Sequence, residues 1–175
     1  MILKYEHMNG DYGEAAWRIY EESFPRIERR RKEDHQSAMA DEAFKPLVVL
    51  DGEQLVGILF YWKWKDCTYL EHLAFEKACR GRGYGSQVIR DFCQKEQDIV
   101  LEIEPPEDEI AIKRLRFYER LGFQMNPYNH LNLPYRKDLG KHMLKIMSYQ
   151  NCLSQGEYDY FNHLLITSAG AYCEK

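Results

Sequence analysis

The alternation of hydrophobic and polar residues predicts that short strands and helices follow one another along the chain. Residues 2–8 have the β-rich composition of a short strand. The segment Tyr12 to Phe24 carries apolar residues at helical spacing and is stopped by Pro25. A second helix is predicted over Ile27 to Ala40, with the basic cluster Arg29 to Lys32 near its start, and such a cluster is typical of a solvated face. The first forty residues therefore predict one strand followed by two helices.

The centre of the chain is rich in β-branched and aromatic residues, and a glycine loop interrupts it. Four runs have the composition of strands: 47–50, 55–61, 68–75 and 99–103. The first two are joined through Asp51-Gly52, a hairpin signal because glycine accepts a positive φ. The third run leads into the glycine loop Arg80 to Gly85, after which a helix with an apolar stripe begins. The fourth run ends before Pro105-Pro106, which cannot donate to a β-ladder.

The last third of the chain predicts two further helices and two closing strands. A helix over Glu109 to Leu121 has an acidic first turn and is followed by Gly122 at the C-cap position. Strands are predicted over Phe123 to Leu131 and Met143 to Tyr149, and a final helix follows Ser154. The pattern predicts an α/β domain over residues 1–150, and a C-terminal helical extension over 151–175 that packs on this domain or on a neighbouring subunit.

Composition and charge narrow the class of protein. The 175 residues are 45% hydrophobic and 30% charged, the balance of a globular domain. No apolar run approaches the roughly 20 residues of a membrane span, and the first residues lack a signal-peptide core, so we expect a cytoplasmic protein without membrane contact. A net charge of −4 argues against nucleic-acid binding. Five scattered cysteines without a Cys-x-x-Cys pair favour free thiols and imply no metal site.

The glycine loop has the chemistry of a phosphate site. Closely spaced glycines at a helix N-terminus leave backbone N–H groups free near a partial positive charge, and Arg80 and Arg82 add ionic contacts. Glycines that serve only for packing are the alternative. A nucleotide-triphosphate loop is excluded because Ser86-Gln87 stands where that loop needs Lys-Ser or Lys-Thr. A dinucleotide fingerprint is disfavoured by the glycine spacing and by the hairpin that precedes the loop.

Two blocks of sequence resemble the GNAT superfamily of N-acetyltransferases. The superfamily signature Arg/Gln-x-x-Gly-x-Gly/Ala is matched by Arg80 to Gly85, and Phe117 to Phe123 is similar to a second family block. The resemblance covers about residues 2–149. It implies a mixed central sheet with splayed central strands, acetyl-CoA as acyl donor, its pyrophosphate on the glycine loop, and its pantetheine arm between residues 69–75 and 99–103. The implied cofactor-binding residues are Leu73, Ala74, Phe75, Arg80, Gly81, Arg82, Gly83, Tyr84, Gly85 and Ser86.

The resemblance also assigns roles in the chemistry. It implies that the Tyr118 hydroxyl protonates the departing thiolate, and that Glu71 is a general base on the strand before the loop. The alternatives are that Tyr118 is a core aromatic and that Glu71 pairs with a neighbouring cation or faces solvent. Strand alternation predicts that Glu71 shares a face with Tyr69, Leu73 and Phe75, and that His72 points to the other face as a structural histidine. Backbone N–H groups of residues 73–75 would polarise the thioester. Many relatives carry an asparagine at the position of Ala111, so one cofactor contact differs here.

These residues predict a defined activity with an open acceptor. The expected function is transfer of an acetyl group from acetyl-CoA to a primary amine of a small molecule or peptide by direct attack. The alternative is a non-catalytic acyl-CoA-binding or sensing module, and RNA-directed acylation is a weaker third hypothesis. Acceptor contacts are expected from the first two helices and from the loop over residues 126–139, with Arg26, Arg29, Tyr128 and Tyr135 as candidates.

Overall fold

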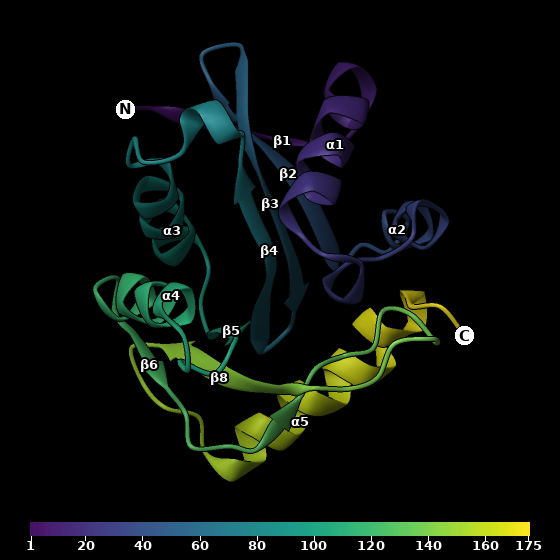
Figure 1. The fold of residues 1–175 in the computed structure, drawn as a ribbon, viewed down its shortest axis with the longest axis vertical. Helices are drawn as coiled ribbons and strands as arrows, with labels where there is room; N and C mark the ends of the chain where they lie inside the picture. The colour runs from purple at the N-terminus through teal and green to yellow at the C-terminus, as the bar shows by residue number, and fades with distance from the viewer.

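A mixed β-sheet lies between two layers of helices in the computed structural model, which describes all 175 residues (Figure 1). Helices α1 (Gly13–Ser23) and α2 (Lys32–Ala38) cover one face, and α3 (Tyr84–Lys95) and α4 (Glu109–Glu119) cover the other. The strand order is β1-β2-β3-β4-β5-β8-β6, with β7 also paired to β8. The strands are β1 (Leu3–His7), β2 (Phe44–Asp51), β3 (Gln54–Trp64), β4 (Cys67–Phe75), β5 (Ile99–Ile103), β6 (Phe123–Met125), β7 (His130–Leu131) and β8 (Met143–Tyr149).

The predicted order of elements is confirmed, with two differences. The β2–β3 hairpin turns at Gly52 with a φ of 63°, as the Asp-Gly pair predicts. The predicted strand 123–131 is broken into β6 and β7, because Pro127 lies between them and has no N–H to donate. The second helix begins only at Lys32, since Arg29 and Arg31 have extended backbones.

Each face of the sheet carries its own hydrophobic cluster. The cluster under α1 and α2 includes Tyr20, Phe60 and Trp62, each of which is 0% exposed. The cluster under α3 includes Val88 and Ile89 from the apolar stripe that the sequence predicts for this helix. Burial of apolar surface on both faces explains why the central strands read as nearly continuous hydrophobic runs.

The C-terminal helix α5 (Gln155–Thr167) adds to the cluster on the α1 and α2 side. It begins with a capping box in which the Ser154 hydroxyl accepts from the Glu157 N–H, and the Glu157 carboxylate accepts from the Ser154 N–H. Phe161 and Leu165 are each 1% exposed and belong to the same cluster as Tyr20. This extension therefore packs on the sheet of its own chain. None of the helices combines the length and apolar character that crossing a membrane requires.

The sheet opens in its middle, between β4 and β5. These parallel strands pair only at Thr68 with Ile99, Tyr69 with Val100 and Leu70 with Leu101. Beyond Leu70 the two strands separate, although β4 continues to Phe75 alongside β3. The predicted splay of the two central strands is confirmed, and it leaves the second half of β4 with an unpaired edge.

A β-bulge in β4 marks the point of separation. Phe60 pairs with His72 and Tyr61 pairs with Leu70, so Glu71 is an extra residue without a partner on β3. The bulge reverses the alternation that follows it. Glu71 therefore does not share a face with Leu73, which packs in the α3-side cluster. His72 lies on the α1 side, against Tyr20, and not on the opposite face from Glu71. The predicted alternation was wrong because the sequence gives no sign of the extra residue.

Candidate active site

The glycine loop connects β4 to α3 and ends in an uncapped helix N-terminus. Gly83 is the N-cap residue of α3, has a left-handed φ of 84°, and makes no side-chain cap hydrogen bond. The first N–H groups of the helix therefore have no partner within the chain and point outward. Gly81 also has a positive φ of 75°, and a Cβ at either glycine would meet no atom within 4 Å. The loop thus presents open backbone donors at the positive end of a helix dipole.

The other residues of the predicted loop differ in what they can offer a bound ligand. Arg80 donates from Nε to the Phe75 carbonyl at 3.1 Å, and its exposed guanidinium lies beside the loop. The Tyr84 hydroxyl donates to Asp51 at 2.7 Å, so this side chain anchors the helix to the β2–β3 hairpin. A Cβ at Gly85 would lie 3.4 Å from the Phe117 ring, an ordinary van der Waals contact, so the packing leaves room for one. Tyr84 and Gly85 can offer a ligand only their backbones.

The free edge of β4 presents two backbone donors toward the gap between the splayed strands. The Glu76 N–H donates to the Val56 carbonyl on β3 at 3.0 Å. Because N–H groups alternate sides along a strand, those of Phe75 and Leu73 point away from β3, toward the side that β5 has left. The Ala74 N–H points to β3 instead. Of the three predicted backbone donors, the geometry therefore leaves Leu73 and Phe75 available.

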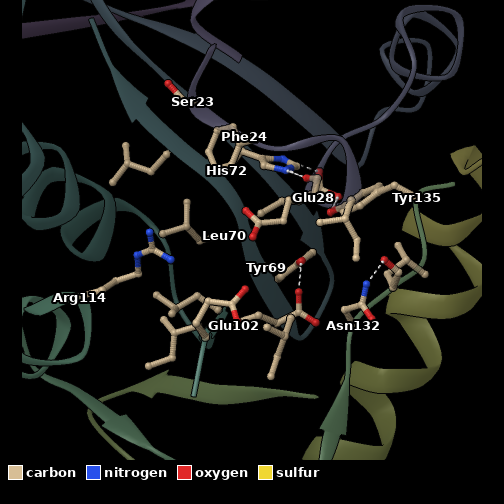
Figure 2. Close-up of a pocket in the computed structure, with 18 of the residues that line it drawn as sticks. Ser23, Phe24, Glu28, Tyr69, Leu70, His72, Glu102, Arg114, Asn132 and Tyr135 are labelled. Carbon is tan, nitrogen blue, oxygen red and sulfur yellow. Dashed lines mark hydrogen bonds and ion pairs between the residues drawn. The ribbon is translucent and has the colours of Figure 1, made fainter. Parts of the chain in front are cut away.

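A cavity of about 170 Å³ lies at the splay and is lined from five parts of the chain (Figure 2). Its walls come from the segment between α1 and α2, from β4, from β5, and from α4, and residues of the β7–β8 loop close one side. Figure 2 shows Glu28 and His72 near its centre, with Arg114 and Tyr135 on opposite sides. The charged residues in the lining are Glu28, Glu71, Glu102, Glu104 and Arg114.

Tyr118 reaches this cavity from α4, as the family block implies. Its ring packs against Phe117 and Phe123, with centroids 5.1 and 5.5 Å away. Burial raises the pKa of the Tyr118 hydroxyl to about 12, so the group keeps its proton at neutral pH. It makes no hydrogen bond to any other group of the chain. The hydroxyl is therefore free to donate to a bound molecule.

Glu71 is not available to act as a general base. Its side chain is 0% exposed, and Arg30 Nη1 donates to it at 2.7 Å. The Tyr135 hydroxyl and the Trp62 indole donate to the same carboxylate at 2.9 and 3.1 Å. Burial by itself would raise the pKa of Glu71, but the Arg30 guanidinium outweighs burial and holds this pKa well below its ordinary value. A strongly acidic, fully bonded carboxylate is a poor proton acceptor, so the structure replaces the base prediction for Glu71 with a structural role.

Two other carboxyl groups meet in the cavity, and the sequence analysis missed both. Glu28 lies between α1 and α2, and Glu104 directly follows β5. Burial raises the pKa of Glu28, the charge of Glu104 and a hydrogen bond between the two carboxyls raise it further, and Arg114 opposes the shift. A carboxylate just past the end of a central strand was the available signal for Glu104. No local pattern singles out Glu28, because its position depends on the chain turning back over β4.

The predicted acceptor contacts divide into two groups. Tyr135 lines the cavity. Tyr128 does not, because its hydroxyl donates to the Leu153 carbonyl at 2.6 Å and its ring stacks on Tyr158. Arg26 pairs with Asp138 at 3.2 Å, and Arg29 pairs with Glu21 at 3.3 Å, both outside the lining. Only the tyrosine of the β7–β8 loop is therefore brought to the site.

Comparison with known proteins agrees with this geometry. Residues 11–123, well over half of the chain, match the family model described as the acetyltransferase (GNAT) family. The chain belongs to the GNAT family of acetyltransferases. The matched segment contains the glycine loop, both splayed strands, Glu28, Glu104 and Tyr118. It ends before the β7–β8 loop and α5, so the residues that close the cavity on the Tyr135 side lie outside the family model.

Several proteins are similar to this GNAT protein in sequence or in fold. The protein YjbC of Bacillus subtilis (strain 168) is 31% identical over 105 residues, which span 59% of this chain and 53% of that protein. The match thus spans about half the length of this curated relative. A GNAT-family acetyltransferase structure from Bacteroides thetaiotaomicron covers 100% of both chains with 26% identity and a TM-score of 0.89. Arabidopsis thaliana Naa50, solved with the bisubstrate analogue CoA-Ac-MVNAL, covers 85% of this chain and 98% of its own, with 17% identity and a TM-score of 0.59.

Proposed function

We propose that this GNAT protein transfers the acetyl group of acetyl-CoA to a primary amine of a small molecule or peptide, by direct attack of the amine. The observation that carries the proposal is the cavity at the splay of β4 and β5. A carboxyl of raised pKa, Glu28, and a protonated, unpartnered phenol, Tyr118, both line it. Amine acetylation needs one group that removes a proton and one that supplies a proton.

The donor side of the site fits acetyl-CoA. The uncapped N-terminus of α3 and the open backbone at Gly81 and Gly83 suit a pyrophosphate, and Arg80, Arg82 and Ser86 lie beside them. The gap beside the free edge of β4 suits an extended pantetheine arm, which can pair with backbone groups as a strand would. When bound, acetyl-CoA supplies an activated acetyl group as a thioester.

The chain's own groups would carry the proton transfers. Glu28, sharing a hydrogen bond with Glu104, takes a proton from the ammonium form of the acceptor and leaves a nucleophilic amine. The N–H groups of Leu73 and Phe75 would donate to the thioester carbonyl oxygen as the amine forms the new C–N bond. Tyr118 would give its hydroxyl proton to the thiolate released when the C–S bond breaks, and the proton lost by the new amide nitrogen would restore the phenol. Glu71 takes no part in this sequence.

The charges of the cavity favour a cationic acceptor. Three carboxylates in the lining have no arginine or lysine within ion-pair distance: those of Glu28, Glu102 and Glu104. Arg114 is the one arginine in the lining, which contains no lysine. A net negative cavity attracts ammonium groups and repels carboxylates. We therefore expect amines without a nearby carboxylate to be better acceptors than free amino acids.

The pH dependence of acetylation tests the assignment of Glu28. Because the base must be ionised, kcat/KM should rise with pH along a limb whose pKa lies above that of an ordinary carboxyl. Glu104→Gln removes a charge that raises the pKa of Glu28, so the limb should move to lower pH. Arg114→Gln removes a charge that lowers this pKa, so the limb should move to higher pH. The measurement is kcat/KM against pH for the wild type and both variants.

The two variants control for each other, since each removes one charged side chain from the lining of the same cavity. Opposite shifts support a carboxyl base next to Glu104. Shifts in the same direction, or a limb that neither substitution moves, would show that the titrating group lies elsewhere.

A further inference from the structure

The bulge in β4 turns two consecutive side chains to the same side of the sheet. The Glu71 carboxylate accepts from Trp62, and the His72 ring packs edge-on against Tyr20 and Phe24, with centroids 4.8 and 4.6 Å away. Both residues therefore face α1. In a regular strand one of them would face α3 instead. The extra residue is what brings an imidazole to the segment that carries Glu28.

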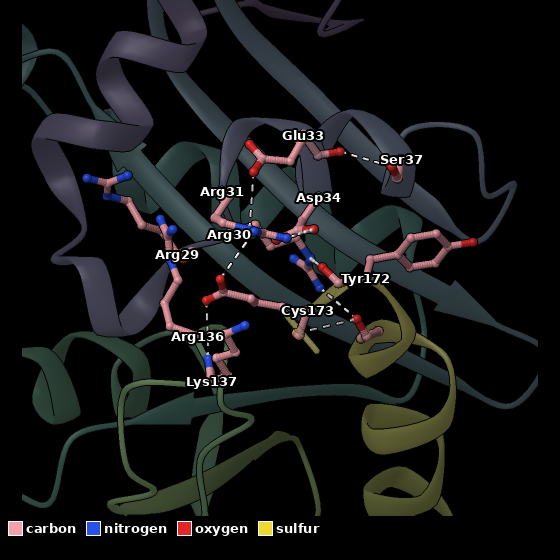
Figure 3. Close-up of polar contacts among 12 residues, drawn as sticks. Arg29, Arg30, Arg31, Glu33, Asp34, Ser37, Arg136, Lys137, Tyr172 and Cys173 are labelled. Carbon is pink, nitrogen blue, oxygen red and sulfur yellow. Dashed lines mark hydrogen bonds and ion pairs between the residues drawn. The ribbon is translucent and has the colours of Figure 1, made fainter.

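A buried ion pair holds the bulge in place. Arg30 is 0% exposed and donates to Glu71 from Nη1. Its other nitrogens donate to the carbonyls of Ala169 and Tyr172, at 3.0 and 3.2 Å. Figure 3 shows Arg30 next to Tyr172 and Cys173 at the C-terminal end of the chain. The C-terminal segment thus fixes Arg30, and Arg30 fixes the carboxylate at the bulge.

His72 makes one hydrogen bond, and its partner is the main chain of Glu28. The distance from Nε2 to the Glu28 carbonyl oxygen is 2.7 Å. Because a carbonyl only accepts, Nε2 must carry the proton. Nδ1 lies 3.7 Å from the Glu71 carboxylate and has no hydrogen-bond partner. The residue is 4% exposed, so aromatic walls and this single bond fix the ring.

Glu28 itself has few other restraints, although the residues after it are held: Arg136 donates from Nε to the Arg29 carbonyl at 3.2 Å, and the Arg30 N–H donates to the Tyr20 hydroxyl at 2.9 Å. Arg26–Glu28 form a single 3-10 turn without a side-chain cap, and the following residue is extended. The Glu28 N–H donates to the Pro25 carbonyl at 2.9 Å. Among the backbone and side-chain bonds of the chain, the one from His72 is the contact that ties the Glu28 carbonyl to the sheet.

We propose that His72 is a positioning residue for acetyl transfer, which holds the main chain of Glu28 so that its carboxyl meets Glu104 in the cavity. This inference rests on the proposed function, in which Glu28 is the base. His72 also lines the cavity, but it transfers no proton to acceptor or donor and acts through the Glu28 carbonyl.

The test compares two amides at this position. In His72→Gln the side-chain nitrogen lies about where Nε2 lies and can still donate to the Glu28 carbonyl. In His72→Asn the nitrogen lies nearer the position of Nδ1 and cannot reach it. We expect kcat/KM of the Asn variant to fall about ten- to a hundredfold below that of the Gln variant, the order of loss caused by a misplaced catalytic group. The KM for acetyl-CoA should be equal in both.

The pH profile separates positioning from packing. Both variants remove the imidazole, whose charge lowers the pKa of Glu28, so the two amides are compared with each other: the acid limb of His72→Asn should lie at lower pH than that of His72→Gln, because only in the Asn variant does Glu28 lose its contact with Glu104. Both variants introduce a polar amide of similar size, so their thermal midpoints serve as the folding control. Equal kcat/KM and equal limbs for the two variants, with Glu28→Gln inactive, would overturn the role of His72 alone. An active Glu28→Gln would overturn the base assignment and this inference with it.

Discussion

Replacing Tyr118 with phenylalanine should reduce kcat for acetyl transfer by roughly a hundred- to ten-thousandfold, the usual contribution of a positioned general acid. The substitution removes only the hydroxyl, whose pKa burial raises to about 12 and which has no partner in the chain. The ring contacts with Phe117 and Phe123 would remain. Steady-state kinetics at saturating acetyl-CoA would measure the loss in kcat, and the affinity for acetyl-CoA should change little.

A matched control is Tyr128→Phe. This substitution also removes one tyrosine hydroxyl, but that hydroxyl donates to the Leu153 carbonyl at 2.6 Å and lies outside the cavity. It should leave kcat unchanged. If Tyr118→Phe kept wild-type kcat at every pH, the phenol would be a packing residue and another proton donor would be needed.

Replacing Glu71 with glutamine should destabilise the fold by about 3–5 kcal/mol, the cost of leaving a buried charge without its partner. The carboxylate and the Arg30 side chain are both 0% exposed, so no solvent screens the pair. Glutamine has nearly the same shape, and hence the loss comes from charge and not from a cavity. The free energy of unfolding in urea, at constant m-value, is the quantity to measure.

The pH dependence of this loss has a defined sign. Because the pKa of Glu71 is lowered in the folded state, its contribution is complete above its ordinary pKa of 4.5 and declines only as pH falls below that value. The difference between wild type and Glu71→Gln should therefore be constant near neutrality and shrink in acid. Glu109→Gln is the control, because its pair with Lys113 is 81% and 72% exposed and should contribute little. A difference no larger than that of the control would mean that the buried pair adds no stability.

The two substitutions with the largest predicted effects should change different properties of the protein, catalytic activity in one case and folding stability in the other. Tyr118→Phe should lose activity and keep stability, whereas Glu71→Gln should lose stability first. The Glu71 carboxylate is not placed to exchange protons with the cavity. The activity that remains in folded Glu71→Gln would therefore depend on how well His72 and the free edge of β4 keep their positions.

Local sequence signals were sufficient to predict the glycine loop before α3 and the place of Tyr118 in the order of elements. The glycines at Gly81 and Gly83 determine the loop conformation through their positive φ, and α3 follows directly. Tyr118 lies in a contiguous block whose place after β5 is determined by element order. Such features depend on neighbours within a few residues, and for this reason the pattern predicts them well.

The acceptor side depends on contacts between distant segments, which no local pattern records. Glu71 and Arg30 are 41 residues apart, and Arg30 and Tyr172 are 142 apart. A basic cluster such as Arg29 to Lys32 is typically solvated, yet Arg30 is buried because one carboxylate and two carbonyls surround it. The bulge at Glu71 inserts one residue into an otherwise regular alternation, so every face assigned beyond it is reversed.

Thiol release from acetyl-CoA in the presence of a panel of amines, measured for wild type and for Glu28→Gln, would distinguish an acetyltransferase that uses Glu28 as its base from a protein that only binds acyl-CoA. We expect wild type to release CoA together with an equal amount of acetylated product from at least one amine, with cationic amines preferred over free amino acids. Glu28→Gln should bind acetyl-CoA equally well and turn over far more slowly. The contradicting result is protection of the wild type by acetyl-CoA against thermal unfolding without thiol release for any amine, which would indicate a non-catalytic acyl-CoA-binding module.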